Sequence, residues 1–455
     1  MKKLIVLLAA AMLLSGCNVQ AGSMPEGLSG SSNSSSLSSP SSAAAPAEEA
    51  SAPVIKVLEQ KGDAPSSGSA SVSSSKAENS VNEEEEDMQS VLLKKTAGLL
   101  DLYREETDAA GKNVMLSPAS LWAALGLTAN GAEGETLKEL EQFLGMDVQA
   151  VNKLFSQLQD DEVLKTANSM WYRDQANAAK EGRLTPAEEF RKTASNLYQA
   201  EAYECDFTDP ATVGRINQWA SAHTDGMIPE IIDRLEPNTA MVLLNALLFE
   251  GLWINPYDKS QVREETFRTS DGSQVQAQML CSKESVYLEN DKATGFIKAY
   301  EDGYYFVAAL PKAEGAFTLE QLSLNTLLES AEHSYEVYAK LPKFSFSSGS
   351  SLVDLMKKAG VVQAFQEEKT DFSRMFQEDV PVWIGDVVQK TKIELTEAGT
   401  KAAAVTSVMM MAKTALIPDT MRREVYLDRP FAFLIMKEGL EVPLFAGIVE
   451  DPTMG

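Results

Sequence analysis

A stretch near the C-terminus combines the residue types of a buried strand with the setting of a loop. It runs from Glu397 to Val408 and consists mostly of small, uncharged residues. In an extended chain, alternate side chains point to opposite faces. One face would carry Thr400, Ala402, Ala404 and Thr406. Between Thr400 and Val408 the only charged residue, Lys401, falls on the other face. This stretch could therefore be a loop that becomes a strand by burying one side.

Histidine and cysteine, which commonly serve in catalysis and metal binding, are scarce in this chain. The two histidines, His223 and His333, do not lie beside a G-x-S-x-G sequence, and Cys205 and Cys281 lie far apart without ligand spacing. We therefore expect no catalytic residues, no metal and no cofactor. An extracytoplasmic chain could join these two cysteines, but one pair is no disulfide framework, and we expect two free, buried thiols.

The composition describes an acidic globular chain. It has 455 residues, of which 44% are hydrophobic, and a formal net charge of -26. This hydrophobic content is ordinary for a globular protein and suffices for a substantial core. An acidic chain lacks the basic surface that a phosphate backbone requires, so we expect no nucleic acid partner.

The N-terminus has the features of a secretion signal. Lys2 and Lys3 precede an apolar run over residues 4–14, which is too short to span a membrane. The Leu-Ser-Gly-Cys sequence that ends at Cys17 resembles the lipobox of bacterial lipoproteins. This resemblance implies that residues 1–17 are a lipoprotein signal peptide, cleaved before Cys17, whose thiol is then lipidated. The mature chain would be secreted and lipid-anchored at the outer face of a bacterial cell membrane, extracellular or periplasmic. The alternative is an ordinary signal peptide with a chance cysteine.

Residues 18–87 are of low complexity and rich in serine, alanine and glutamate. This composition cannot bury enough apolar surface to fold, so it predicts a disordered tether. A flexible chain of this length would average roughly 45–50 Å between its ends. It would hold a domain that begins near Met88 away from the membrane.

From Met88 onward, the pattern predicts both helices and strands. Apolar residues at helical spacing predict helices over 91–104 and from Thr136, and Ser117 followed by Pro118 predicts the cap and first turn of another. Apolar runs predict strands over 239–249, 304–310 and 336–344, and a hairpin formed by 431–436 and 442–449. The strand at 239–249 should be buried on both faces. These elements place the domain in the α+β class.

Short motifs between Met88 and Gly455 occur in the order found in the serpin family. They are Asn113–Ser120 (N-x-x-x-S-P-x-S), Leu127–Leu144, Ile216–Trp219, Thr224–Ile228, Leu244–Trp253, Leu341–Phe344, Arg429–Phe433 and Pro443–Gly447. The segment from Glu397 to Thr406 is close to the family's E-x-G-T-E-A-A-A-A-T hinge. Residues 88–455 therefore resemble a serpin domain.

This resemblance implies a fold and a mechanism. The fold would have about nine helices around three β-sheets and an exposed reactive-centre loop. A serine protease attacks that loop and forms an acyl-enzyme, and the cleaved loop then inserts into a sheet as a new strand. The protease is carried along and distorted, so the acyl bond persists. The chain would be a monomeric inhibitor and not an enzyme, and its partner would be a serine protease held in a covalent complex.

The hinge implied by the resemblance consists of small or uncharged residues after one acid. They are Glu397, Gly399, Thr400, Ala402, Ala403, Ala404 and Thr406. A charged inward side chain would be costly to desolvate between two strands, so this composition favours an inhibitory serpin. Gly399 can adopt backbone geometry that other residues cannot, as a pivot needs. The rival function is that of a non-inhibitory serpin acting as a surface binding protein.

Counting from Glu397 as in the family places the cleaved bond between Lys413 and Thr414. A lysine there suits trypsin-like proteases, whose primary pocket is acidic. A shift of one residue would expose Ala412 or Thr414 instead. The neighbouring run Met409–Met411 would suit elastase-like or chymotrypsin-like enzymes.

Two groups of supporting residues carry over by position. The "shutter", where the sheet opens, would use Ser117, Ser120, Asn245 and Gln389. Gln389 stands where the family has a histidine; it can donate and accept hydrogen bonds but cannot titrate, so we expect no pH-gated opening through it. The "breach", where the loop inserts first, would use Trp253 and an ion pair between Lys343 and Glu397.

Overall fold

The computed structural model describes residues 87–156, 163–173, 184–235, 241–378, 382–400 and 421–454. These ranges contain eight α-helices: α1 (Met88–Glu106), α2 (Pro118–Gly131), α3 (Gly134–Leu144), α4 (Val148–Ser156), α5 (Glu188–Tyr198), α6 (Ala211–His223), α7 (Leu324–Glu329) and α8 (Val353–Lys358). The strands in them are β1 (Val114–Leu116), β2 (Leu164–Arg173), β3 (Glu201–Cys205), β4 (Met241–Phe249), β5 (Val262–Arg268), β6 (Gln274–Glu284), β7 (Val286–Glu289), β8 (Ala293–Ala299), β9 (Tyr304–Pro311), β10 (Glu336–Pro342), β11 (Phe344–Ser351), β12 (Val388–Leu395), β13 (Arg422–Tyr426), β14 (Phe431–Lys437) and β15 (Phe445–Val449). The α+β class is confirmed.

Helix α2 begins where the sequence predicts. The Ser117 hydroxyl accepts a hydrogen bond from the amide of Ser120, and Pro118 occupies the first turn, where its missing N–H costs nothing. Both faces of the helix are buried, and the indole of Trp122 donates to the carbonyl of Leu144 at 3.0 Å. This packing fixes the position of Ser117 at the edge of the neighbouring strands.

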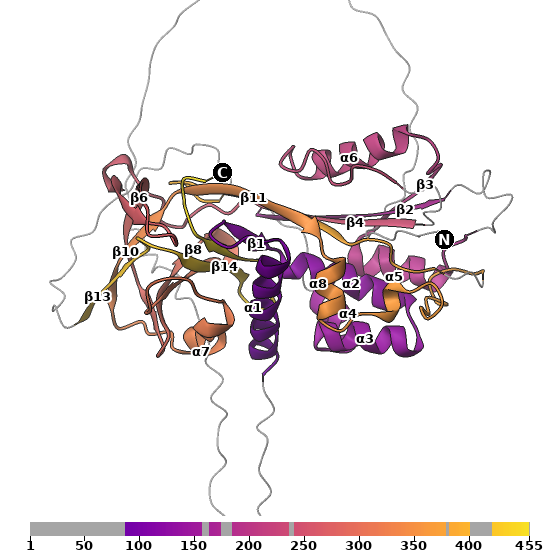
Figure 1. The fold of residues 1–455 in the computed structure, drawn as a ribbon, viewed down its shortest axis with the longest axis horizontal. Helices are drawn as coiled ribbons and strands as arrows, with labels where there is room; N and C mark the ends of the chain where they lie inside the picture. Colours follow the sequence, from indigo (N-terminus) through magenta and orange to yellow (C-terminus); the bar gives the residue numbers. More distant parts are fainter. Residues whose placement is uncertain are drawn as a thin grey trace, which may run out of the picture. The chain divides into compact units, whose positions relative to one another are not determined.

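Two sheets form the larger part of the β-structure (Figure 1). A six-stranded sheet has the order β1-β15-β14-β9-β8-β7, and a four-stranded sheet has the order β13-β10-β6-β5. Strand β9 is buried along its whole length, as is β14 except at its last residue. Continuous apolar runs are expected of strands that are covered on both faces. The predicted C-terminal hairpin is confirmed, because β14 pairs antiparallel with β15.

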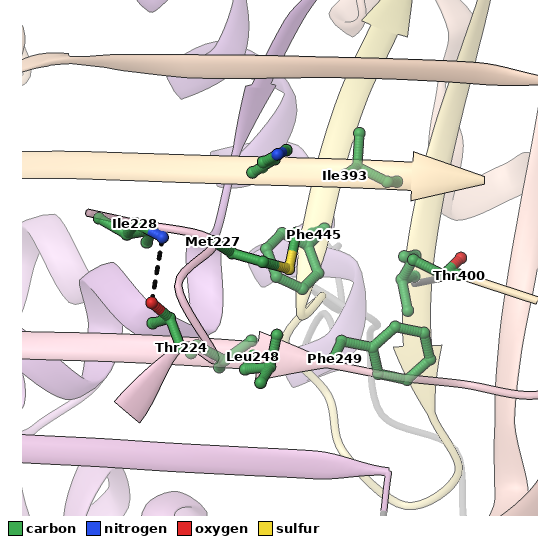
Figure 2. Close-up of a pocket in the computed structure, with 11 residues that line it drawn as sticks. Thr224, Met227, Ile228, Leu248, Phe249, Ile393, Thr400 and Phe445 are labelled. Carbon is green, nitrogen blue, oxygen red and sulfur yellow. Dashed lines mark hydrogen bonds between the residues drawn. The ribbon is translucent and has the colours of Figure 1, made fainter. Parts of the chain in front are cut away.

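The remaining strands form two smaller sheets that lie edge to edge (Figure 2). The first has the order β3-β2-β4, and the second consists of β11 and β12. Strands β4 and β12 run in the same direction on the two sides of a narrow space (Figure 2). Within the described residues no hydrogen-bond ladder joins β4 to β12, so each presents a backbone edge to that space.

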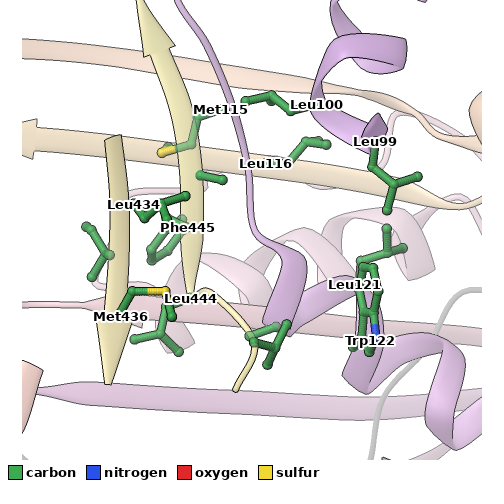
Figure 3. Packing of buried hydrophobic residues seen from close by; sticks show 14 of the residues in the cluster. Leu99, Leu100, Met115, Leu116, Leu121, Trp122, Leu434, Met436, Leu444 and Phe445 are labelled. Atoms are coloured by element: carbon green, nitrogen blue, oxygen red, sulfur yellow. The ribbon is translucent and has the colours of Figure 1, made fainter. Parts of the chain in front are cut away.

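The main core lies between the six-stranded sheet and the first two helices. Met115 and Leu116 of β1 and Leu434 of β14 pack near Leu100 of α1 and Leu121 of α2 (Figure 3). A second cluster lies on the far side of β2 and β4, where α6 covers them (Figure 1). The β3-β2-β4 sheet is thus held between α6 on one face and α2 with its neighbours on the other.

Eight α-helices and four sheets lie in the described ranges, in agreement with the expected fold of helices around β-sheets. The structure corrects two other expectations. The apolar run 336–344 is two strands in different sheets, because β10 ends at Pro342 and β11 begins at Phe344. The thiols of Cys205 and Cys281 are not joined in a disulfide, but only Cys205 is buried and Cys281 is half-exposed.

Candidate functional site

The space between β4 and β12 is the candidate site, and we call it the slot. Leu248 and Phe249 of β4 line one side, Lys392 and Ile393 of β12 line the other, and Thr400 closes one end (Figure 2). At this end of the slot, the space that water could occupy is about 20 Å³, close to that of a single molecule. Unpaired strand edges are templates for another strand. The slot therefore has two open edges and almost no free volume between them.

The segment that follows α6 covers the slot. Met227 and Ile228 reach into it, and the Ile228 amide donates to the Thr224 hydroxyl at 3.1 Å (Figure 2). Lys390 Nζ of β12 donates to the carbonyl of Glu230 at 2.7 Å. Because α6 packs on β4 and Lys390 belongs to β12, this covering segment is attached to both of the smaller sheets.

The chain leaves β12 through a tight turn, Thr396–Gly399, and comes back toward the slot. The Thr396 amide donates to the carbonyl of Gly399 at 2.8 Å, and Leu395 pairs with Thr400 in an antiparallel bridge. On the other side, the Thr400 amide donates to the carbonyl of Gly251 at 2.9 Å. Thr400 thus lies between Leu395 at the end of β12, with which it pairs, and Gly251 just after β4, to which it is hydrogen-bonded. The first residue of a strand between β4 and β12 would take this position. We call Thr396–Thr400 the loop root.

Two glycines allow the close approach at this point. A Cβ atom on Gly399 would lie 1.9 Å from the carbonyl oxygen of Gly251, a distance that real Cβ atoms do not reach. A Cβ atom on Gly251 would lie 2.4 Å from the Phe249 ring. At Gly399, the pivot expected from the sequence, the chain passes directly over the carbonyl of Gly251. Only a residue without a side chain fits there.

The breach residues meet at the loop root. Trp253 is buried; its amide donates to the carbonyl of Ala398 at 2.9 Å and its indole to the carbonyl of Thr396 at 3.1 Å. Lys343 Nζ lies 2.9 Å from Glu397 Oε1, and both side chains are about one-third exposed, at 34% and 37%. Burial raises the pKa of Glu397, but the hydrogen bond and charge of Lys343, with a backbone hydrogen bond, outweigh it and leave the pKa below its ordinary value.

Thr400 also has a side-chain partner in the core. Its hydroxyl lies 2.6 Å from the hydroxyl of Tyr300, and Thr400 is only 3% exposed. The Tyr300 ring stacks on Trp253, with centroids 3.9 Å apart and an angle of 11°. Burial raises the pKa of Tyr300 far above its ordinary value, so this hydroxyl stays protonated. The Thr400 side chain therefore points into the core, as the sequence predicts.

The shutter residues lie at the other end of β12. Gln389 is buried; its Oε1 accepts from the Ser117 amide at 2.9 Å, and its Nε2 donates to the Ser117 carbonyl at 3.0 Å. The Ser117 hydroxyl donates to the carbonyl of Leu444 at 2.7 Å. Gln389 therefore contacts the backbone of Ser117, while the hydroxyl of that serine binds elsewhere. Asn245 lies in β4 opposite Asn168, and its side chain is outside the described part of the structure.

Several predicted residues lie outside the described ranges. They are Cys17, the tether 18–87 apart from Asp87, the hinge residues Ala402, Ala403, Ala404 and Thr406, and the bond between Lys413 and Thr414. Among the described residues, no group of histidine, cysteine and acidic side chains is placed to hold a metal ion. No helix in those ranges combines the length and apolar character needed to cross a membrane.

Two residues that support the loop root were not predicted from the sequence. Lys298 lies near the end of β8 and Tyr300 just beyond it, about a hundred positions before Thr400 in the chain. In the sequence, the only indication is that Lys298 lies within an apolar run. The structure shows that its side chain is buried, and a buried lysine requires an acid beside it. Nothing in the sequence indicates which acid that is.

Comparisons with known proteins agree with this geometry. The profile of the family described as "Serpin (serine protease inhibitor)" matches residues 96–452. Serpin-ZXA of Oryza sativa subsp. japonica is 32% identical over 368 residues, which cover 76% of this chain and 91% of that protein. An uncharacterized serpin-like protein of Thermococcus kodakarensis is 30% identical, covering 78% of this chain and 84% of its own length.

Solved structures show the same fold. The native state of tengpin, a thermophilic serpin, has a TM-score of 0.69 and 31% identity, and the match covers 82% of this chain and 97% of tengpin. The latent state of tengpin has a TM-score of 0.65, with 81% and 99% covered. The serpin fold expected from the sequence is confirmed, and a protease-inhibitor family supports a non-catalytic role. The chain belongs to the serpin family of serine protease inhibitors.

Proposed function

We propose that this chain inhibits serine proteases as a suicide substrate, by inserting its cleaved loop as a strand into the slot. The observation that carries the proposal is the position of Thr400. Its amide already donates to the carbonyl of Gly251 and it pairs with Leu395 of β12, beside two strand edges that have no partner between them in the described residues. The turn that would reverse the chain between β12 and a new strand is also formed. Insertion would therefore extend a strand whose first residue is in place.

The covalent step uses the protease's own catalytic groups. The protease serine oxygen attacks the carbonyl carbon of Lys413, the bond to the Thr414 nitrogen breaks, and an ester to Lys413 forms. The protease histidine takes the serine proton and passes it to the leaving amine of Thr414. Hydrolysis of the ester would release the protease, so insertion must be faster than the arrival of water. The inhibitor contributes stored conformational energy and no catalytic group.

The distances suit such a step. Extended at about 3.3 Å per residue, the chain from Thr400 to Lys413 spans roughly 45 Å. Strands β4 and β12 have 9 and 8 residues, so the inserted segment would run past the full length of both. Lys413, with its attached protease, would move from one end of the sheet to the other. Met227 and Ile228, which now reach into the slot, would have to leave it.

The small residues of the hinge fit the dimensions of the slot. With about 20 Å³ free, a side chain that turns inward must be small or must displace its neighbours. A charged side chain would also lose its hydration between apolar walls formed by residues such as Leu248 and Ile393. Thr400, Ala402, Ala404 and Thr406 meet both requirements, which supports an inhibitor over a non-inhibitory binding protein.

For the target we propose trypsin-like proteases, because a lysine precedes the cleaved bond. A shifted bond near Met409–Met411 would instead serve elastase-like or chymotrypsin-like enzymes. We further propose that the inhibitor is monomeric and held at the outer face of a bacterial cell membrane by a lipid on Cys17. The lipobox-like sequence before that cysteine supports the anchor. Labelling with a fatty acid analogue should mark the wild-type chain and not a Cys17→Ala variant.

Incubation with trypsin tests the inhibitor proposal. We expect a complex that survives SDS, together with release of a fragment that begins at Thr414. Thr400→Arg should yield cleaved chain without complex, whereas Lys401→Arg, with the same new side chain on the outward face, should still form the complex. Cleavage without any stable complex, with trypsin-, elastase- and chymotrypsin-like enzymes alike, would show that the chain is not an inhibitor.

A further inference from the structure

A buried cation packs against the segment that holds the loop root. Lys298 is 2% exposed and is located near the end of β8. Its Nζ lies 3.0 Å from Oε1 of Glu284, which is itself 10% exposed, and donates to the carbonyl of Asn255 at 3.1 Å. An ammonium group removed from water is costly unless it is paired and hydrogen-bonded. Each of these contacts is therefore needed to keep the side chain where it is.

The remaining contacts of the ammonium group are with two aromatic rings. It lies 4.4 Å from the ring centroid of Tyr257 and 5.3 Å from that of Trp253. Cation–π attraction is stronger where water is excluded. Trp253, Asn255 and Tyr257 belong to one short segment after β4, which we call the strip Trp253–Tyr257. Lys298 thus binds this strip at both ends and in the middle.

The same strip holds the loop root through its backbone. The Trp253 amide donates to the carbonyl of Ala398, and the Tyr257 amide donates to the carbonyl of Glu397, both at 2.9 Å. The Tyr257 hydroxyl lies 3.3 Å from Oγ of Ser282, which in turn donates to Glu284. The charge pair and the loop root are therefore connected through one segment of five residues, with no other element between them.

We propose that Lys298 is a positioning residue for loop insertion. It holds the strip Trp253–Tyr257 in the geometry that keeps the turn Thr396–Gly399 formed and Thr400 between the two walls of the slot. This inference rests on the insertion mechanism proposed above. After cleavage, a preformed first strand residue speeds insertion, and the inhibitor traps the protease before water releases it. Without Lys298 the loop root would be less ordered, and more inhibitor would be consumed as substrate.

Three variants separate positioning from general stability. Lys298→Met keeps the length and apolar stem of the side chain and removes the charge. Lys298→Met combined with Glu284→Gln removes both charges. This double variant replaces the single one if an unpaired Glu284 prevents folding. Arg104→Met is the matched control, because Arg104 and Glu450 form a pair of similar burial, 12% and 1% exposed, between α1 and the C-terminal segment.

The first measurement is hydrogen exchange of the uncleaved protein. The amides of Trp253, Tyr257 and Thr400 should exchange several-fold faster in both Lys298 variants than in the wild type, and should be unchanged in Arg104→Met. This result does not depend on inhibition. If the wild type traps no protease, the proposed function fails, while faster exchange at these amides still shows that Lys298 holds the loop root.

The second measurement is the stoichiometry of trypsin inhibition and the second-order rate of loop attack. The Lys298 variants should consume several-fold more inhibitor per complex, with an unchanged rate of attack, whereas Arg104→Met should leave the stoichiometry as in the wild type. Unchanged exchange in both Lys298 variants would overturn the proposal. A rise in stoichiometry as large in Arg104→Met would do so too, because it would trace the effect to lost stability alone.

Discussion

The hydroxyl of Tyr300 lies 2.6 Å from the hydroxyl of Thr400, and both side chains are buried. This hydrogen bond joins the core to the first residue that enters the slot. The Tyr300 ring is fixed by its stack on Trp253, so the hydroxyl is presented in one direction. The loop root is therefore held by a side-chain bond as well as by the backbone bonds on each side.

Removing one partner of this bond should cost more than removing both. Tyr300→Phe leaves the Thr400 hydroxyl buried without that partner, and we expect a loss of about 1–3 kcal/mol in stability. Adding Thr400→Val, which has nearly the same shape, should restore much of the loss. Thermal unfolding of the two single variants and the double variant completes the cycle. Additive losses would show that the two hydroxyls do not interact.

Gly399→Ala should dislodge the loop root, because the new methyl group would overlap the carbonyl of Gly251. Overpacking of this kind costs about 1–3 kcal/mol. The control is Gly214→Ala in α6, where no atom lies within 4 Å of the new methyl group and a gain of up to about 1 kcal/mol is expected. Unfolding midpoints and exchange of the Thr400 amide measure both. An unchanged loop root in Gly399→Ala would contradict the close approach described above.

The pair between Lys343 and Glu397 should weaken in acid. The folded-state pKa of Glu397 lies below its ordinary value of 4.5, so its contribution is present above that pH and is lost as the pH falls through the folded pKa. Because both side chains are about one-third exposed, we expect no more than about 1 kcal/mol. Glu397→Gln should therefore expose the loop root to exchange at pH 7, with a difference from wild type that is smaller at pH 3.

The matched control for that experiment is Glu314→Gln. It removes the partner of Arg268 in a surface pair, and the loop between β9 and α7 that carries Glu314 is distant in sequence from the loop root. Exchange at the amides of Glu397–Thr400 should be the same as in wild type at both pH values. Equal exposure of the loop root in the two variants would assign the effect to net charge and not to the Lys343 pair.

Gln389→Glu should make the shutter sensitive to pH. The new carboxylate keeps an acceptor for the Ser117 amide but turns an oxygen toward the Ser117 carbonyl, at an expected cost of about 2 kcal/mol or more at neutral pH. Burial raises the pKa of such a group, and protonation restores a donor, so the cost should shrink as the pH falls. Gln389→Met, which loses both bonds, should be destabilised equally at every pH. Parallel pH profiles for the two variants would contradict this account.

Local features of the fold could be predicted from the sequence. Ser117 and Pro118 mark the start of α2 because capping depends only on neighbouring residues. The hairpin of β14 and β15 follows from two apolar runs with a short connection. The sequence predicts one strand across Lys343 because apolar residues resume at Phe344, although the alternation shifts by one residue where the chain changes sheet.

Only those residues of the candidate site that belong to a family motif could be predicted from the sequence. Glu397, Gly399 and Thr400 carry the hinge pattern, and the structure places all three at the end of the slot. The contact between Tyr300 and Thr400 joins residues 100 positions apart, and no local pattern reports such a contact. The ion pair of Lys298 depends in the same way on which acid the fold brings near, so it too required coordinates.

Hydrogen exchange before and after loop cleavage is the sharpest test of whether the loop becomes a strand between β4 and β12. Cleavage by trypsin should slow exchange of the amides on the facing edges of Met241–Phe249 and Val388–Leu395, which in the uncleaved chain have no strand partner between them in the described residues. The pair β5 and β6 in another sheet should be unchanged. Exchange in β4 and β12 that stays the same or becomes faster after cleavage would contradict insertion of the loop.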